Sequence, residues 1–191
     1  MCLLLLLFGS TSLDAQATKR RGLWGEAGFN IGATLSDKSQ LSLPNDMGFG
    51  GNFYITALGV HLPSLDGLQV GLGLYRAGYG NPNELRHNGL HLDLRYAPIK
   101  TLKRLQLSTM VGLPISDVDM VISGYTKYHT KFYGTLALGW ELPKLLGKLG
   151  LSPAVGVSYT SFDYTYSAVG VSRQGASSQG TVFFRLGIRL N

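Results

Sequence analysis

The last eleven residues of the chain, TVFFRLGIRLN (residues 181–191), place a large apolar side chain at every second position. These positions are Val182, Phe184, Leu186, Ile188 and Leu190. Between them stand Arg185, Gly187 and Arg189. A period of two predicts a β-strand with two unlike faces, one apolar and one carrying two arginines. The architecture depends on which of these faces points inward.

The same period of two recurs along the chain from Gly22 onward, in segments separated by turn-rich stretches. We predict eight strands, at residues 22–35, 48–62, 67–79, 88–98, 103–115, 127–142, 149–162 and 179–191. Glycine is abundant, with 26 of 191 residues, and is spread through these segments rather than gathered in a linker. No run of 18 apolar residues occurs, so no transmembrane helix is predicted.

The connections between the predicted strands alternate in length. Those after the second, fourth and sixth strands (PSLDG, PIKTL and PKLLGK) are short and begin with proline, whereas the others are mostly longer. Short turns at one end and long loops at the other are typical of an up-and-down antiparallel barrel in an outer membrane. The sequence therefore predicts an all-β, eight-stranded antiparallel transmembrane β-barrel.

Side-chain chemistry assigns the two faces of this barrel. In the fourth segment Leu90, Leu92 and Leu94 share one face, and His91, Asp93 and Arg95 share the other. An arginine facing lipid at the bilayer midplane costs roughly 2–4 kcal/mol, so we expect the apolar face to meet lipid and the polar face to line the lumen. The second segment changes phase in its middle, which predicts a β-bulge around Thr56 or Ala57.

The first residues have the features of a secretory signal. Residues 3–8 form a short apolar core, and the small residues Ala15 and Ala17 form a cleavage site after residue 17. We therefore expect residues 1–17 to be a signal peptide and residues 18–191 to be the barrel domain. The single cysteine, Cys2, lies in that signal, so neither a disulfide nor a cysteine metal site is expected in the mature chain.

With its signal, its eight alternating segments and its terminal strand TVFFRLGIRLN, the mature chain resembles the small eight-stranded outer-membrane barrels of the OmpA-like and OmpX-like family. The resemblance is architectural, and no site residue carries over from it. It implies an outer-membrane location and recognition by the barrel assembly machinery. Members often end in an aromatic residue, whereas this chain ends in Leu190-Asn191, which shifts that recognition to Phe183 and Phe184.

The most specific candidate site is a set of charged residues at the alternate strand positions that are expected to face the lumen. They are Glu26, Asp93, Arg95, Lys131, Glu141, Arg185 and Arg189. Because the first and last strands are neighbours in a closed barrel, Glu26 is expected to pair with Arg189 or Arg185. We interpret the set as an ion-pair network that fills a narrow barrel; the alternative is a gated pore whose charges select solutes.

Three further hypotheses compete with this one. His87, His91 and His129 also occupy positions expected to face the lumen, near the mouth formed by the long loops. Imidazoles there would suit a metal or pH-sensing site, although the spacing of the three histidines is not that of a known metal-ligand motif. His91 and Asp93 would serve, with Ser108, as the base and nucleophile of a lipid-directed enzyme. Gly22-Leu23-Trp24 is similar to the start of lipocalins, which are soluble barrels that bind ligands.

The function expected from these observations is non-enzymatic, with no cofactor. We expect an outer-membrane structural or surface-interaction protein whose external loops, particularly 114–127 and 163–178, contact extracellular ligands. A narrow small-solute pore is the principal alternative. The remaining partners expected are outer-membrane lipids and the assembly machinery. Basic residues in the turns are not interleaved with aromatics, so nucleic-acid binding is not expected.

Overall fold

The structure is a computed structural model, which describes residues 23–37, 49–62, 65, 67–79, 85–98, 102, 104–118, 126–146, 149–168 and 171–190. Its strands are β1 (Leu23–Asp37), β2 (Phe49–His61), β3 (Leu68–Tyr79), β4 (Leu85–Tyr96), β5 (Leu105–Val118), β6 (Thr126–Trp140), β7 (Leu142–Leu146), β8 (Leu149–Ala168) and β9 (Val171–Leu190). Within these residues no helix is long and apolar enough to cross a membrane. The predicted signal peptide, residues 1–17, lies outside the described residues.

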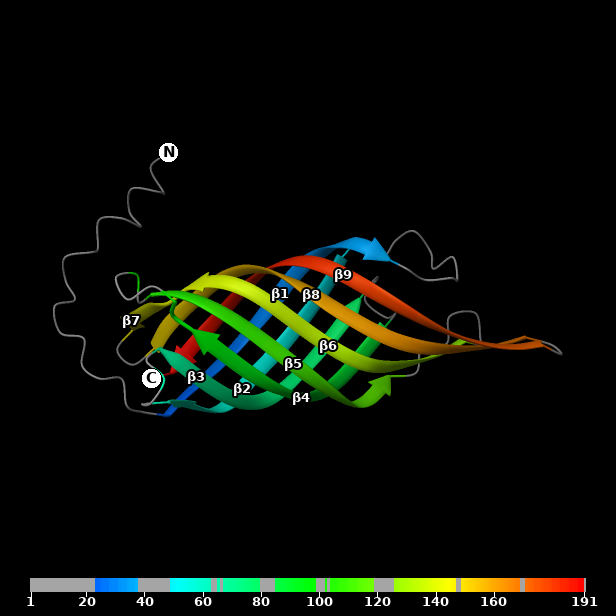
Figure 1. The fold of residues 1–191 in the computed structure, drawn as a ribbon, viewed down its shortest axis with the longest axis horizontal. Helices are drawn as coiled ribbons and strands as arrows, with labels where there is room; N and C mark the ends of the chain where they lie inside the picture. The colour runs from blue at the N-terminus through cyan, green and yellow to red at the C-terminus, as the bar shows by residue number, and fades with distance from the viewer. Residues whose placement is uncertain are drawn as a thin grey trace.

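Eight long antiparallel strands close into a barrel (Figure 1). Neighbouring strands pair in the order β6-β5-β4-β3-β2-β1-β9-β8, and β6 pairs with β8 to complete the ring. The short β7 adds to the end of β8. In lipid an open sheet edge would leave backbone groups without partners, and closure removes such edges. The predicted eight-stranded up-and-down barrel is confirmed.

The terminal strand shows which face is inside. Phe184 and Ile188 are 49% and 54% exposed on the outer wall, whereas Arg185 and Arg189 are 2% and 0% exposed in the interior. The same division holds around the ring, with leucine, isoleucine and valine outside and charged, amide, hydroxyl and several aromatic residues inside. This barrel is therefore apolar outside and polar inside, as a transmembrane barrel requires. A lipocalin-like apolar interior is not what the structure has.

Several β-bulges interrupt the strand pairings, and two of them bear on the predicted facing of side chains. The pairing of β2 with β3 shifts between Thr56 and Leu58, so the bulge predicted at Thr56 or Ala57 is confirmed. A second bulge, which was not predicted, interrupts the pairing of β6 with β8 between Thr130 and Phe132. The extra residue at this second bulge is Lys131, and it reverses the facing of every β6 residue on its N-terminal side.

The last two strands are much longer than a membrane requires. β8 and β9 each have 20 residues, whereas a transmembrane strand needs about 9–11. Their outer parts pair with each other up to Ala168 and Val171 and form a ribbon that projects beyond the other strands (Figure 1). The loop predicted at 163–178 is therefore wrong, since most of this stretch is a β-hairpin. Of the other predicted loop, 114–127, residues 114–118 and 126–127 belong to strands and 119–125 lie outside the described residues.

Glycines let bulky side chains fit inside this narrow ring. A Cβ placed on Gly59 would lie 2.1 Å from the Trp24 ring, and one on Gly112 would lie 2.8 Å from the Tyr75 ring. Gly67 has a different role, because its φ of 85° forms the turn between β2 and β3. Most of the alternating glycines thus reflect a crowded interior.

Candidate functional site

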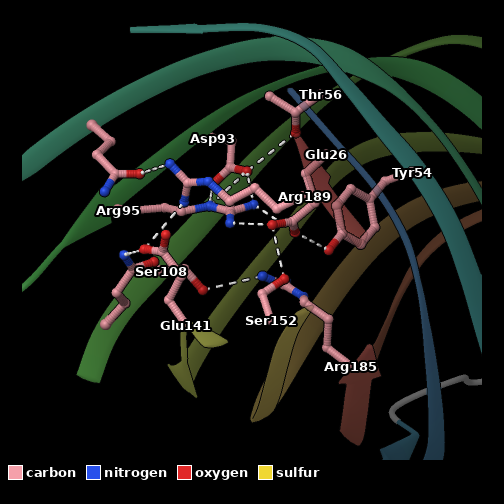
Figure 2. A network of polar contacts seen from close by, with 12 residues as sticks. Glu26, Tyr54, Thr56, Asp93, Arg95, Ser108, Glu141, Ser152, Arg185 and Arg189 are labelled. Carbon is pink, nitrogen blue, oxygen red and sulfur yellow. Dashed lines mark hydrogen bonds and ion pairs between the residues drawn. The ribbon is translucent and has the colours of Figure 1, made fainter. Parts of the chain in front are cut away.

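A cluster of buried charged side chains fills the half of the interior near the end where β1 starts and β9 ends (Figure 2). At its centre Arg95, near the end of β4, donates through Nη1 and Nη2 to the two carboxylate oxygens of Glu26 at 2.6 and 2.8 Å. Its Nη2 also donates to Asp93 at 2.6 Å. This planar fork of donors matches two carboxylates at once.

Glu26 links four strands through one carboxylate. Besides Arg95 of β4, it accepts hydrogen bonds from the Tyr54 hydroxyl of β2 at 2.5 Å and from the Ser152 hydroxyl of β8 at 2.8 Å. A Cβ on Gly187 of β9 would lie 2.5 Å from Glu26 Oε1, so the glycine makes room for the carboxylate. The backbone register places Glu26 opposite Arg189, as closure predicts. The prediction of an ion pair with Arg189 or Arg185 is nevertheless wrong, because the arginine that binds Glu26 comes from across the lumen.

A second charged group lies beside the first. Arg189 approaches Glu141 at 3.7 Å and donates to the amide oxygen of Gln69 at 2.8 Å. Glu141 in turn accepts a hydrogen bond from Gln106 at 2.6 Å. The Trp24 ring joins the two groups, since the guanidinium carbons of Arg95 and Arg189 lie 4.6 and 4.5 Å from its centroid. Both distances fall within the range of cation–π attraction.

Arg185 is held by neutral groups. Its guanidinium donates to Asn30 Oδ1 at 3.0 Å, Ser108 Oγ at 3.1 Å and Thr135 Oγ1 at 3.0 Å. Among the described buried side chains, three arginines and three carboxylates balance in formal charge. The charge of Arg185 is therefore compensated by the cluster as a whole rather than by one contacting carboxylate.

Aromatic side chains fill the other half of the interior. Tyr75 and Tyr133 stack with their ring centroids 4.8 Å apart, and His87 lies edge-on to Tyr75 at 5.4 Å. Tyr128, Phe162 and Tyr164 continue this layer outward. Tyr54, Tyr128 and Tyr164 thus point into the interior.

Two small cavities interrupt the packing. One, of about 20 Å³, lies among the charged residues, between Glu26, Arg95 and Arg185. The other has a similar volume of about 20 Å³ and is lined by Asn30, Asn52 and Thr181, each of which has a buried polar atom without a protein partner. A volume of this size holds about one water molecule. Within the described part of the chain, neither cavity has the width of a solute channel.

The predicted lumen residues divide into two groups. Glu26, Asp93, Arg95, Glu141, Arg185 and Arg189 are buried inside as predicted. Lys131 is not: its side chain is 57% exposed on the outer wall, where it pairs with Asp163 at 2.6 Å. The bulge at this position reverses its facing, so the prediction for Lys131 is wrong.

The predicted histidine site is not assembled. His87 and His91 are buried in the interior, but His129 precedes the same bulge and faces outward. His91 Nε2 lies 3.0 Å from Thr56 Oγ1, and His87 Nδ1 lies 3.2 Å from the Tyr75 hydroxyl. Among the described residues no group of three histidine, cysteine or acidic side chains could hold a metal ion.

His91, Asp93 and Ser108, considered above as residues of a lipid-directed enzyme, have other partners. His91 bonds to Thr56, Asp93 binds Arg95, and Ser108 accepts from Arg185 while donating to the Ala137 carbonyl at 3.5 Å. All four contacts belong to the polar network of the interior. None of these four contacts joins His91 to Asp93 or to Ser108.

Some contributors to the charged cluster were not identified from the sequence. Trp24, Tyr54, Gln69 and Gln106 all contact charged groups of the cluster. The alternation of residues could have identified two of them. Trp24 lies two residues before Glu26, and Tyr54 lies two residues before Thr56, so each shares the lumen-facing side of its strand. The sequence instead draws attention to the tryptophan as part of a tripeptide similar to lipocalins.

Comparison with known proteins supports the fold. No protein-family model matches the chain, and no curated protein matches it in sequence. Among solved structures the barrel is similar to the outer membrane protein AlkL, whose structure was determined in DMPC lipid bilayers by solid-state NMR. The TM-score is 0.54 at 16% identity, and the match covers 92% of each chain. At this identity the likeness establishes the fold alone, and that fold is a small eight-stranded outer-membrane barrel.

Proposed function

We propose that this chain is an integral outer-membrane protein with a closed interior and a non-enzymatic structural or surface-interaction role. The apolar outer wall and the likeness to AlkL support the membrane location. On this proposal its partners are outer-membrane lipids, the assembly machinery that inserts it, and a ligand outside the cell. Of the two phenylalanines expected to guide assembly, Phe184 faces outward and Phe183 inward.

The observation that carries this proposal is the filled lumen. Arg95, Glu26 and Asp93 connect opposite walls, Arg189 and Glu141 fill the space beside them, and the cavities between these groups have room for about one water each. Eight strands form a ring that side chains can fill. A barrel with a filled interior can contact ligands only at its two ends and along its wall.

The projecting hairpin of β8 and β9 is the element best placed for such contacts. Its outer pairs, from Ser161 and Ser178 to Ala168 and Val171, continue past the last pairs of β1 with β9. β6 pairs with its β8 strand as far as Tyr166, and beyond that residue the tip is held by pairs between β8 and β9. A rigid scaffold that carries a variable tip is a common arrangement for recognition.

Planar-bilayer conductance tests the closed interior. We expect the purified full chain to give no resolved current steps, and Arg95→Ala to produce steps because the guanidinium that bridges Glu26 and Asp93 is removed. The variant should first be shown to fold by the heat-dependent change in gel mobility that closed barrels display. Resolved steps from the unaltered protein would overturn the closed interior.

The second candidate is a narrow small-solute pore. It is favoured by one observation, namely that in the described structure the interior is closed by side chains alone. Arg185 in particular contacts only neutral oxygen atoms and the Met110 sulfur, so a change of its rotamer breaks no contact with a carboxylate. Steps from the unaltered protein that vanish in Arg185→Met would support a pore in which this arginine lines the path.

A further inference from the structure

Two arginines stand together on the outer wall of the barrel, on β3 and β4. Arg76 pairs in register with Asn88, and Arg86 lies two residues from Asn88 on the same strand. Diagonal neighbours of this kind have Cα atoms about 7–8 Å apart. Arg76 is exposed and Arg86 is half-buried. Both side chains therefore leave the same face of the sheet, close enough to reach one ligand.

This arginine pair lies at the upper edge of the apolar belt, toward the loop end. On β3 the outward positions before Arg76 are Leu72 and Leu74, and on β4 those after Asn88 are Leu90 and Leu92, all of them exposed. Asn88 and Ser116 lie beside the pair, joined by a hydrogen bond of 3.4 Å. On β3 and β4 the outer wall thus changes from leucine to arginine and asparagine, while Phe53 of β2, the register partner of Arg76, and Ile115 of β5 are exposed apolar neighbours.

Among the described residues neither arginine has a carboxylate partner. Lys131 provides the contrast, because it stands on the same outer wall and is paired with Asp163 at 2.6 Å. Within the described part of the chain, Arg76 and Arg86 are therefore two cations on the outer wall without a carboxylate contact.

We propose that Arg76 and Arg86 bind the phosphate of a phosphorylated lipid in the outer leaflet. The planar guanidinium donates two parallel hydrogen bonds to a phosphate, and two guanidinium groups at this spacing can hold one phosphate between them. Asn88 and Ser116 add neutral donors at the same height. The leucines below cover the acyl chains of the same lipid, which a soluble anion lacks, so the wall fits a lipid better than a free phosphate.

The inference rests on the membrane placement of the barrel and not on whether its lumen conducts. A conducting barrel would refute the closed interior and leave this lipid site untouched. Conversely, loss of the lipid site would leave the closed interior as it stands. The two proposals therefore fail separately.

Lipid binding can be measured by native mass spectrometry on the full chain in an uncharged maltoside detergent. The probe is bisphosphorylated lipid A, compared with the same lipid after removal of its phosphates. We expect the phosphorylated form to bind at least tenfold more tightly. Equal affinity for the two forms would overturn the proposal.

Substitutions then assign the binding to the two arginines. Arg76→Gln with Arg86→Gln should weaken phosphorylated lipid binding at least tenfold, whereas Lys131→Gln should change it less than twofold because that lysine is already paired. Both proteins should show the same heat-dependent gel mobility as the unaltered chain, since neither change touches the interior. Unchanged affinity in the double variant, or an equal loss in Lys131→Gln, would refute a site built on Arg76 and Arg86.

Discussion

Glu26→Gln probes the centre of the charged cluster. The change keeps the shape of the side chain and removes its charge, so the Arg95 guanidinium loses a partner that it contacts at 2.6 and 2.8 Å. Breaking a buried ion pair by removing one member typically costs about 3–5 kcal/mol. Arg95 keeps Asp93 at 2.6 Å, and the amide that replaces the carboxylate would retain part of the hydrogen bonding, so we expect the lower end, about 3 kcal/mol.

The assay is equilibrium unfolding in urea of the full chain refolded into lipid vesicles, followed by the gel mobility of the folded form. Lys131→Gln is the matched control, because it also removes one charge from an ion pair of 2.6 Å but at the exposed outer wall. Exposed pairs contribute about 0.2–1 kcal/mol. If Glu26→Gln lost no more stability than this control, Glu26 would not be a structural centre of the barrel.

A double-mutant cycle separates the ion pair from the effects of each residue alone. Arg95→Met destabilises the protein by leaving Glu26 and Asp93 without their shared cation, and adding Glu26→Gln removes one of these two stranded carboxylates. The combined loss should therefore be smaller than the sum of the single losses, with a coupling of roughly 0.5–3 kcal/mol. Additive losses would show that the two side chains act independently despite their short distances.

Two further variants test the crowded interior and the projecting hairpin. Gly59→Ala should lower the unfolding free energy by about 1–3 kcal/mol, because its Cβ would lie 2.1 Å from the Trp24 ring. Gly51→Ala is the control and should have little effect in the same urea assay, because the nearest atom to its Cβ is 3.6 Å away. Equal effects of the two substitutions would contradict the close packing of Trp24. Replacing the hairpin tip, Ser167–Ser172, by Asn-Gly should leave the heat-dependent gel mobility unchanged, since the residue pairs that are removed lie only between β8 and β9. A barrel that no longer folded would show that the tip is needed for closure.

The sequence predicted the fold because lipid and lumen impose opposite requirements on alternate residues. Wherever both environments are present, as at Phe184 and Arg185, the period of two is strong and its facing is clear. The phase change near Ala57 could be recognised for the same reason. After this point the apolar residues of the strand move from odd to even positions, and only a bulge keeps them all on the outer face.

The signal disappears where strands leave the membrane. Around Lys131 and along residues 163–178 the outward face carries polar side chains such as Lys131 and Asp163 instead of leucines, so alternation in the sequence no longer distinguishes inside from outside. A bulge there moves no leucine into the lumen, and a hairpin rich in serine, glycine and glutamine has the composition of a loop. The reversed facing of His129 and Lys131 and the missed hairpin have this single cause.

The identity of the ion-pair partners could not be read from parity either. The alternation of residues predicts the face on which a side chain lies, and the closure of the barrel predicts which strands are neighbours. For this reason Glu26 was placed correctly beside the last strand. A long arginine side chain in a narrow lumen, however, reaches past the adjacent strand. Arg95 meets Glu26 from three strands away in the ring, and this contact depends on the stagger of the strands and on glycines such as Gly187 that leave space for the carboxylate.

Stability and recognition are separated along the barrel. Arg86 and Arg95 lie on the same strand nine residues apart, which at about 3.3 Å per residue corresponds to about 30 Å. Arg95 faces the lumen near the end where β9 finishes, and Arg86 faces outward near the other end. Sites more than about 7–10 Å apart without shared partners contribute almost independently to stability. Substitutions on the outer wall near Arg86 or at the hairpin tip are therefore expected to leave the charged cluster intact, since neither region contributes a side chain to it.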